Sequence, residues 1–429
     1  MKRVLMIAFH FPPLNVSSGI QRTLRFAQYL PAHGWEPLVL TAHPRAYSSV
    51  SPQHGLVASS GPLVRRAFAL DSSRHLSIAG WHPRWLSLPD RWWSWWLGAV
   101  PAGLELIRKF KPDALWSTYP IATAHLIGRT LQQRTGIPWV ADFRDPMAQS
   151  DYPADRLAHR AFEWIEQRTL EHCKRAVFTA PGARTLYVQR YPDIPAERLT
   201  VIENGFDESA FAGAEEDSAS KVAGSGAARP GAGSNAAPAT QRPLVLVHSG
   251  TIYLSERDPL PFFNALAGLS ASGDIGPATL KVVLRATGCD DHLRALIERM
   301  KLDEMVKIEP TVDYRAALSE MLNADGLLVL QAANCNFQVP AKLYEYLRAR
   351  RPILALTDPA GDTAAVLRRA GIDTIAPLDS QSAIADLLLR FIDLVRERRA
   401  PLADAATLAG ASREARTVEL AAVLERAVA

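Results

Sequence analysis

The chain has 429 residues, of which 48% are hydrophobic and 21% are charged, as is typical of a globular protein. The 48 Lys and Arg residues exceed the 44 Asp and Glu residues by four, so anionic partners such as a nucleotide, a phospholipid surface or a polyprenyl phosphate are favoured. No stretch reaches the roughly 18 unbroken apolar residues that would indicate a membrane span.

The N-terminus, MKRVLMIAFHFPP, combines basic residues with an apolar run, as a signal peptide does. The run from Val4 to Phe9 is too short for a signal core and no small-residue cleavage site follows, so we expect a buried first strand instead. The three cysteines show neither metal-ligand nor disulfide spacing, which favours a reducing cytoplasm.

Strand-like and helix-like segments alternate through the first half of the chain. Helical spacing in 20–34 places Leu24, Ala27 and Leu30 on one side, and 122–136 is also helical in pattern. This alternation predicts an α/β fold with a parallel, doubly wound sheet. Its expected strands are 3–9, 36–42, 113–118, 138–143, 175–180 and 199–204.

Five tryptophans lie in the segment RWLSLPDRWWSWWLGAVPAG, at 84–103. Tryptophan is enriched at membrane interfaces, so the segment is a candidate for contact with a membrane or a lipid-linked acceptor. The alternative is a Trp-rich helix that packs under the sheet. The tryptophans concerned are Trp85, Trp92, Trp93, Trp95 and Trp96.

About two-thirds of residues 212–242 are Ala, Gly, Ser or Pro, the composition of a flexible linker. Strand-helix alternation resumes after it, which predicts a second parallel α/β domain. We therefore expect an N-terminal domain at 1–211 and a C-terminal domain at 243–395, with a ligand cleft where the two sheets face each other.

Several common catalytic motifs are missing from the sequence. No G-x-G-x-x-G follows a strand, and there is neither a G-x-x-x-x-G-K-[ST] loop nor a G-x-S-x-G elbow, which argues against dinucleotide oxidoreductases, P-loop enzymes and serine hydrolases. No Asp-x-Asp pair is present to chelate a metal bound to a nucleotide-sugar.

The stretch QVPAKLYEYLRARRPILAL, at 338–356, predicts an anion site. Pro340 fits the first helical position, and the N–H groups of Ala341 to Leu343 would then be free to bind phosphate beside the Lys342 ammonium. Glu345 would lie about 7 Å further along the helix, where its carboxylate can accept hydrogen bonds from a ribose diol. The alternative is that Lys342 and Glu345 form a solvated pair.

A second candidate site follows the strand at 138–143. Asp142, Arg144 and Asp145 lie at its carboxyl end, where they would bind an acceptor or support the reacting centre; the alternative is an internal Arg–Asp brace. Other strand ends contribute further acceptor-side candidates, which are His10, Thr118 and Tyr119.

Five segments in order resemble the retaining glycosyltransferases of family four, which have the GT-B fold of two Rossmann-like domains. The segments are FHFPPLNVSSGIQR, IPWVADFRDP, VIENGFD, HSGTIYLSERDP and VPAKLYEYLRARRPIL. The resemblance covers nearly the whole chain outside 212–242. It also implies that a C-terminal helical segment, 396–429, returns to the first domain.

The resemblance implies roles for further residues. Ser18 and Gly19, in the glycine loop after the first strand, would approach the donor phosphates, as would Gly250 and Thr251 near the start of the second domain. Arg257 would bind the diphosphate and assist catalysis. Glu345 resembles the second glutamate of an E-x7-E pair, which binds the donor ribose.

One departure concerns the first glutamate of that pair, because Phe337 stands in its place. The family's first glutamate touches the transferred sugar, so this contact and the identity of the donor sugar are in doubt. Hydrogen bonds to the sugar could come instead from neighbouring residues, which are Asn334, Asn336 and Gln338. A non-catalytic protein is an alternative that the retained FRD motif and Arg257 disfavour.

The sequence thus predicts a cytoplasmic glycosyltransferase. If the tryptophan segment contacts a membrane, the protein would lie at the inner face of the plasma membrane. It would transfer a sugar with retention from a nucleotide diphosphate to a glycan or polyprenyl-linked acceptor in cell-surface polysaccharide assembly, with no metal, cofactor or nucleic acid. The alternatives are a GT-B nucleotide-sugar epimerase and a non-catalytic nucleotide-sugar-binding protein.

Overall fold

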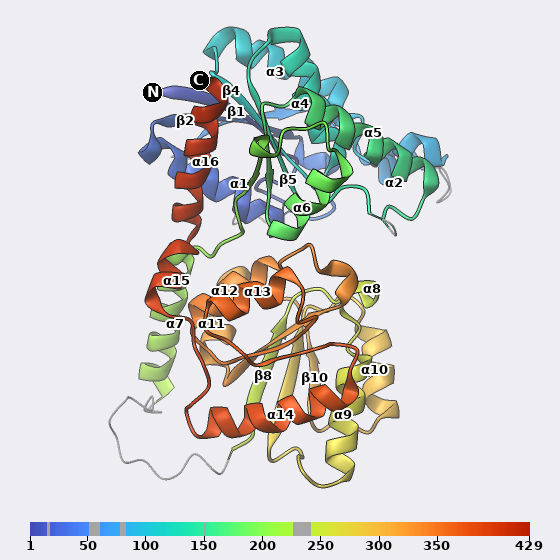
Figure 1. The fold of residues 1–429 in the computed structure, drawn as a ribbon, viewed down its shortest axis with the longest axis vertical. Coiled ribbons are helices and arrows are strands. Elements are labelled where there is room, and N and C mark those ends of the chain that lie inside the picture. The colour runs from blue at the N-terminus through green and yellow to red at the C-terminus, as the bar shows by residue number, and fades with distance from the viewer. Residues whose placement is uncertain (15–17, 51–60, 78–82, 150–151, 226–241) are drawn as a thin grey trace. The chain divides into compact units, whose positions relative to one another are not determined.

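The computed structural model describes residues 1–14, 18–50, 61–77, 83–149, 152–225 and 242–429 (Figure 1). The chain divides into two units. Unit 1 comprises Met1–Asn204 together with Arg413–Ala429, and unit 2 comprises Gly205–Ser412. The return of the last residues to unit 1 means that the chain crosses between the units twice.

In its described residues, unit 1 builds a seven-stranded parallel sheet in the order β3-β2-β1-β4-β5-β6-β7. Its interior strand β1 contains Val4–Ile7, which are fully buried because helices cover both faces of a doubly wound sheet. The strands are β1 (Lys2–Ile7), β2 (Trp35–Ala42), β3 (Leu63–Ala67), β4 (Ala114–Thr118), β5 (Trp139–Arg144), β6 (Arg175–Phe178) and β7 (Leu199–Val201).

The helices of unit 1 cover this sheet, and the C-terminal helix α16 is one of them. Leu420 and Leu424 of α16 pack into the same apolar cluster as Leu24 of α1 and Trp116 of β4, and α16 lies beside α1 in Figure 1. The helices are α1 (Ser18–Tyr29), α2 (Ser72–His75), α3 (Trp95–Phe110), α4 (Ala122–Thr135), α5 (Arg156–His172), α6 (Pro181–Arg190) and α16 (Arg413–Val428).

Unit 2 builds a six-stranded parallel sheet within its described residues, in the order β10-β9-β8-β11-β12-β13. The predicted doubly wound α/β class is therefore confirmed for both units. The strands are β8 (Leu244–Ser249), β9 (Leu280–Arg285), β10 (Val306–Glu309), β11 (Gly326–Gln331), β12 (Ile353–Thr357) and β13 (Ile375–Ala376).

Some helices of unit 2 begin at side-chain caps. The Asp313 carboxylate accepts the N–H of Ala316 at the start of α11, and Ser380 caps α14 in the same way. The helices are α7 (Glu208–Ser225), α8 (Leu254–Arg257), α9 (Leu260–Ala271), α10 (Asp290–Arg299), α11 (Tyr314–Asn323), α12 (Ala341–Ala349), α13 (Asp362–Arg369), α14 (Gln381–Arg396) and α15 (Ala405–Gly410).

The prediction of a flexible linker at 212–242 is wrong for its first part, because α7 extends to Ser225. Phe211 and Ala214 of α7 are fully buried, and the Arg348 guanidinium lies 4.9 Å from the centre of the Phe211 ring. Alanine is the best helix former, so an Ala-rich composition is compatible with a packed helix as well as with a linker. Residues 226–241 lie outside the described residues.

The tryptophan segment forms a turn followed by a helix. Helix α3 begins only at Trp95, which is fully buried, so Trp85, Trp92 and Trp93 precede this helix. The indole N–H of Trp93 donates to the Leu86 carbonyl at 2.6 Å. Trp85 is 66% exposed, whereas Trp92, Trp93 and Trp96 are partly buried. Of the five tryptophans in this segment, Trp85 therefore faces solvent.

No helix within the described residues has both the length and the apolar character that a bilayer crossing requires.

Candidate functional site

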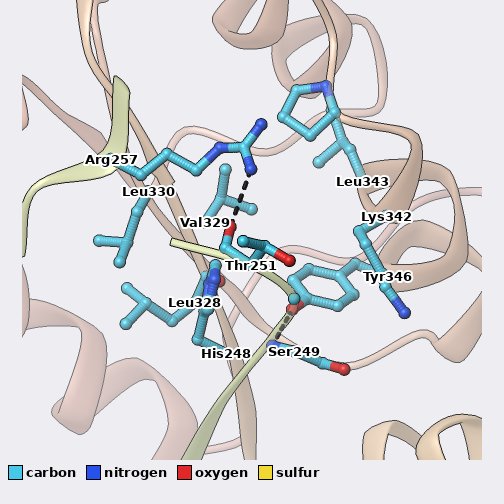
Figure 2. Close-up of a pocket in the computed structure, with 12 residues that line it drawn as sticks. His248, Ser249, Thr251, Arg257, Leu328, Val329, Leu330, Lys342, Leu343 and Tyr346 are labelled. Carbon is cyan, nitrogen blue, oxygen red and sulfur yellow. Dashed lines mark hydrogen bonds between the residues drawn. The ribbon is translucent and has the colours of Figure 1, made fainter. Parts of the chain in front are cut away.

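A pocket in unit 2 lies at the carboxyl ends of β8 and β11, beside the start of α12 (Figure 2). This edge of a parallel sheet is where α/β proteins bind ligands. The residues that line it are His248, Ser249, Gly250, Thr251, Arg257, Leu328, Val329, Leu330, Pro340, Lys342, Leu343 and Tyr346. Six of the predicted donor-binding residues are therefore brought together at one place.

The start of α12 differs by one residue from the expected one. Pro340 has an extended ψ of 128° and is the N-cap, so the helix begins at Ala341. The N–H of Leu343 donates to the Pro340 carbonyl at 2.9 Å and is not free to bind a ligand. The amides of Ala341 and Lys342 precede the first possible intrahelical bond, and they carry the positive end of the helix dipole.

Two cations flank this helix terminus. Arg257 ends the short helix α8, and its Nη1 donates to the Thr251 carbonyl at 3.0 Å. Lys342 is partly exposed, and its Nζ lies 3.4 Å from Oε2 of Glu345. Gly250 connects β8 to this loop at a φ of 144°, a backbone conformation that favours glycine. Together, the two cations and the helix terminus make the pocket suited to an anion.

Glu345 lies one helical turn from the anion site and is only 5% exposed. Tyr314 Oη donates to its Oε1 at 2.8 Å, while its Oε2 has no hydrogen-bond partner and only the Lys342 ion pair. The pair with Lys342 exists, but the carboxylate is buried, which disagrees with the solvated-pair alternative. A buried oxygen without a hydrogen-bond donor favours a ligand hydroxyl at that place.

Six lining residues of this pocket were not predicted from the sequence, and two of them, His248 and Tyr346, have titratable side chains. His248 Nδ1 lies 2.9 Å from the Leu328 carbonyl and must donate to it, while its buried Nε2 has no hydrogen-bond partner. Burial chiefly, with Arg257 and Lys342 nearby, lowers the His248 pKa to about 4. Tyr346 Oη accepts the Ser249 N–H at 2.9 Å, and burial raises the Tyr346 pKa.

The loop that carries Phe337 also carries the proposed substitutes for the missing glutamate. Phe337 is 44% exposed. Asn334 Nδ2 donates to the Ser255 carbonyl at 3.0 Å, and Asn336 Nδ2 donates to Asp358 at 2.6 Å. The Gln338 carbonyl accepts hydrogen bonds from Gln331 and Thr363. The amide nitrogens of Asn334 and Asn336 are thus bonded to residues outside the loop, whereas no group of the described residues donates a hydrogen bond to the buried Asn336 Oδ1.

In unit 1, Asp142 is fully buried at the end of β5 and is braced by Arg22. Two nitrogens of Arg22 donate to the two Asp142 oxygens at 3.0 and 2.9 Å, and Thr118 Oγ1 donates at 2.9 Å. Arg22 also donates to the carbonyls of Ile202 and Glu203. This geometry favours the structural alternative for Asp142 and Thr118, with α1 rather than Arg144 supplying the arginine.

Arg144 and its neighbours form a separate group at the same sheet edge. Arg144 is 7% exposed, adopts a φ of 61°, and makes one side-chain hydrogen bond of 3.3 Å, to the Tyr119 carbonyl. Asp145 accepts from Thr179 at 3.2 Å, and burial raises the Asp145 pKa. Burial and the Arg144 charge lower the His10 pKa to about 3, so His10 is neutral.

Ser18 and Gly19 lie in unit 1, as the first residues of α1, and are not among the pocket residues of unit 2. The residues before them, 15–17, lie outside the described residues.

Comparison with known proteins identifies the N-terminal part. Residues 18–205 match the model of the glycosyl transferase 4-like domain, and the family-four resemblance is confirmed for that segment. No curated protein sequence matches the chain significantly.

Solved structures resemble the whole chain. Anabaena HepE in complex with UDP has a TM-score of 0.67 at 14% identity, with 99% of this chain and 100% of that chain covered. Sucrose-phosphate synthase of Thermosynechococcus elongatus has a TM-score of 0.63 at 14% identity, with coverages of 98% and 97%. UDP-GlcNAc 2-epimerase of Neisseria meningitidis, bound to UDP-GlcNAc, has a TM-score of 0.54 at 11% identity, with coverages of 99% and 100%. At these identities the likeness establishes the fold, which is GT-B.

Proposed function

We propose that the chain is a glycosyltransferase that moves a sugar from a nucleotide diphosphate donor to an acceptor hydroxyl. The observation that carries this proposal is the pocket of unit 2, where Arg257 and Lys342 line a site beside the start of α12 and the carboxylate of Glu345 is buried on the same helix. The glycosyl transferase 4-like match of residues 18–205 and the UDP in the similar HepE structure support it.

In this reaction the bond between the sugar C1 and the diphosphate oxygen breaks, and a bond between C1 and the acceptor oxygen forms. The acceptor hydroxyl loses its proton to solvent, and the diphosphate leaves with additional negative charge. Stabilising that charge is the main electrostatic task. The helix terminus, Arg257 and Lys342 would perform it without a metal ion or a cofactor. Glu345 would hold the donor ribose through the oxygen that has no hydrogen-bond partner.

Unit 1 would hold the acceptor. Arg144 is the best-supported candidate there, because its buried guanidinium makes one long hydrogen bond, and its Nε has no partner. His10, Tyr119 and Asp145 would complete this acceptor side. Asp142 would act as a positioning residue that fixes the end of β5 through Arg22.

The finer proposal is retention at C1, an acceptor that is a glycan or a polyprenyl-linked sugar, and a role in cell-surface polysaccharide synthesis at the cytoplasmic membrane face. It rests on the family-four resemblance and on the exposed Trp85.

A nucleotide-sugar epimerase is the second candidate, because the family glutamate that touches the transferred sugar is replaced by Phe337 and a similar structure is an epimerase. Incubation with UDP- and GDP-sugars separates the candidates. Release of the nucleoside diphosphate that depends on an added acceptor supports transfer, and a donor epimerised without acceptor supports the alternative. Binding without turnover on a broad acceptor panel would indicate a non-catalytic protein.

The same assay tests Arg257. Replacement by alanine should lower turnover more than donor affinity, because the diphosphate gains charge in the transition state. The anomeric configuration of the product, followed by NMR, tests retention.

A further inference from the structure

His248 is a buried polar residue in the lining of the pocket. The proposed reaction assigns no function to its side chain. The residue ends β8 within the pocket lining and is 7% exposed. The Leu328 carbonyl can only accept a hydrogen bond, so the proton of a neutral His248 ring lies on Nδ1. Nε2 is then a buried lone pair to which no group of the described residues donates a hydrogen bond, because the Gly250 carbonyl, which raises the pKa of the ring, can only accept one. Leaving such an atom unsatisfied is costly unless a ligand meets it.

The surroundings of His248 determine what that ligand group can be. The charges of Arg257 on α8 and Lys342 on α12 both contribute to its low pKa. Tyr346 of α12 is occupied by the Ser249 N–H, and the β11 residues beside it in the pocket lining are apolar. The carboxylates near these cations are Glu256, 3.8 Å from Arg257, and Glu345, 3.4 Å from Lys342.

We propose that His248 takes up a proton when the diphosphate binds, and that its Nε2–H then donates a hydrogen bond to a phosphate oxygen. The inference deepens the proposed function and rests on it. An anionic oxygen and an imidazole lone pair repel each other at contact distance, so the pocket can close around a diphosphate at this point only if Nε2 carries a proton. The proton comes from solvent and returns to it when the diphosphate leaves.

The size of the effect is adequate. A unit charge about 4 Å away shifts a pKa by about three units at the effective dielectric constant of a protein. The diphosphate would thus bring the His248 pKa from about 4 to near neutrality. Since binding raises the pKa, donor affinity is greatest at low pH. The affinity falls about tenfold per pH unit between the His248 pKa of the free protein and that of the bound protein, and it levels off above the pKa of the bound protein.

Calorimetry tests this proposal. UDP-glucose and GDP-mannose serve as probes because their diphosphates, esterified at both ends, do not titrate near neutrality. The binding enthalpy at pH 6.5 is measured in buffers of different ionisation enthalpy, and its slope gives the number of protons taken up. For the wild-type chain we expect uptake of between about one half and one proton.

Two variants separate His248 from other groups. His248→Asn keeps a donor for the Leu328 carbonyl but lacks the Nε2 position, and His248→Gln offers a neutral N–H there. Both should bind without proton uptake, with an affinity that no longer changes between pH 6 and pH 8, and the glutamine variant should bind more tightly than the asparagine variant. Thermal unfolding confirms that each is folded.

Three results would overturn the inference. If the wild-type chain bound a nucleotide-sugar without proton uptake, the inference about His248 would be disproved while the proposed function stayed intact. Uptake that persists in both variants would assign the proton to another group. If the wild-type chain bound no nucleotide-sugar or nucleoside diphosphate in a broad panel, the proposed function would fail, and the inference with it.

Discussion

The Oη atom of Tyr314 lies 2.8 Å from Oε1 of Glu345 and donates a hydrogen bond to it, so the first residue of α11 fixes a buried carboxylate on α12. One oxygen of Glu345 is thereby occupied. The other has no hydrogen-bond partner and lies near the Lys342 ammonium. Glu345 is thus held in one orientation before any ligand arrives, which is the arrangement that preorganised binding requires.

Replacing Glu345 by glutamine should weaken nucleoside diphosphate binding by about 1.5–3 kcal/mol, as for a lost hydrogen bond to a charged group. This corresponds to an increase in Kd of roughly 10- to 150-fold, measurable by calorimetry. Glu298→Gln, on the exposed face of α10, is the matched control and should bind as the wild-type chain does. An unchanged Kd for Glu345→Gln would disprove the ribose assignment.

Tyr314→Phe should raise the donor KM several-fold and leave kcat nearly unchanged, because Tyr314 orients Glu345 and does not touch the substrate. A double-mutant cycle with Glu345→Gln should be strongly non-additive, since both changes act through the same contact. Simple addition of the two effects would mean that Tyr314 does not act through Glu345.

Asp142→Asn should lower the free energy of unfolding of unit 1 by about 3–5 kcal/mol, because it leaves the buried Arg22 charge without its carboxylate. All ten tryptophans of the chain lie between residues 35 and 164, so tryptophan fluorescence during denaturation reports unit 1 alone. Exposed Asp193 provides the control substitution. Full stability of Asp142→Asn, combined with loss of turnover, would restore the catalytic interpretation of this residue.

Trp85→Ala and Trp95→Ala should behave differently. Trp85 is 66% exposed, so its replacement should change stability by no more than about 0.5 kcal/mol, whereas truncating the fully buried Trp95 should cost about 3–5 kcal/mol. If the membrane-surface proposal holds, Trp85→Ala also sediments less with anionic vesicles. Equal sedimentation of wild type and Trp85→Ala would end the case for that tryptophan as a membrane contact.

The sheets follow from local sequence patterns, and the anion site is predicted from them. Continuous apolar runs such as Val4–Ile7 mark strands that are buried on both faces, and a helix start with Lys342 and Glu345 after a strand predicts an anion site. The strands that the sequence predicts are present in the structure, although β3 was not predicted and α12 begins one residue later than expected, and the anion site stays a prediction.

The features that sequence reasoning missed depend on distant partners. Arg22 and Asp142 are 120 positions apart, and His248 is 80 positions from the Leu328 carbonyl that fixes its tautomer. For His248, the local signal in the sequence is a histidine at the end of an apolar strand. Helix α7 was missed for another reason, because an Ala-rich segment has the same composition whether or not Phe211 next to it finds a packing partner.

Hydrogen exchange of the full chain, with and without saturating UDP or GDP, tests the central claim most directly. We expect the nucleotide that binds to slow exchange of the amides in 248–257 and 340–346, above all those of Ala341 and Lys342, which have no intrahelical acceptor. Nucleotide binding that leaves both segments unprotected would contradict the assignment of the pocket at β8, β11 and α12.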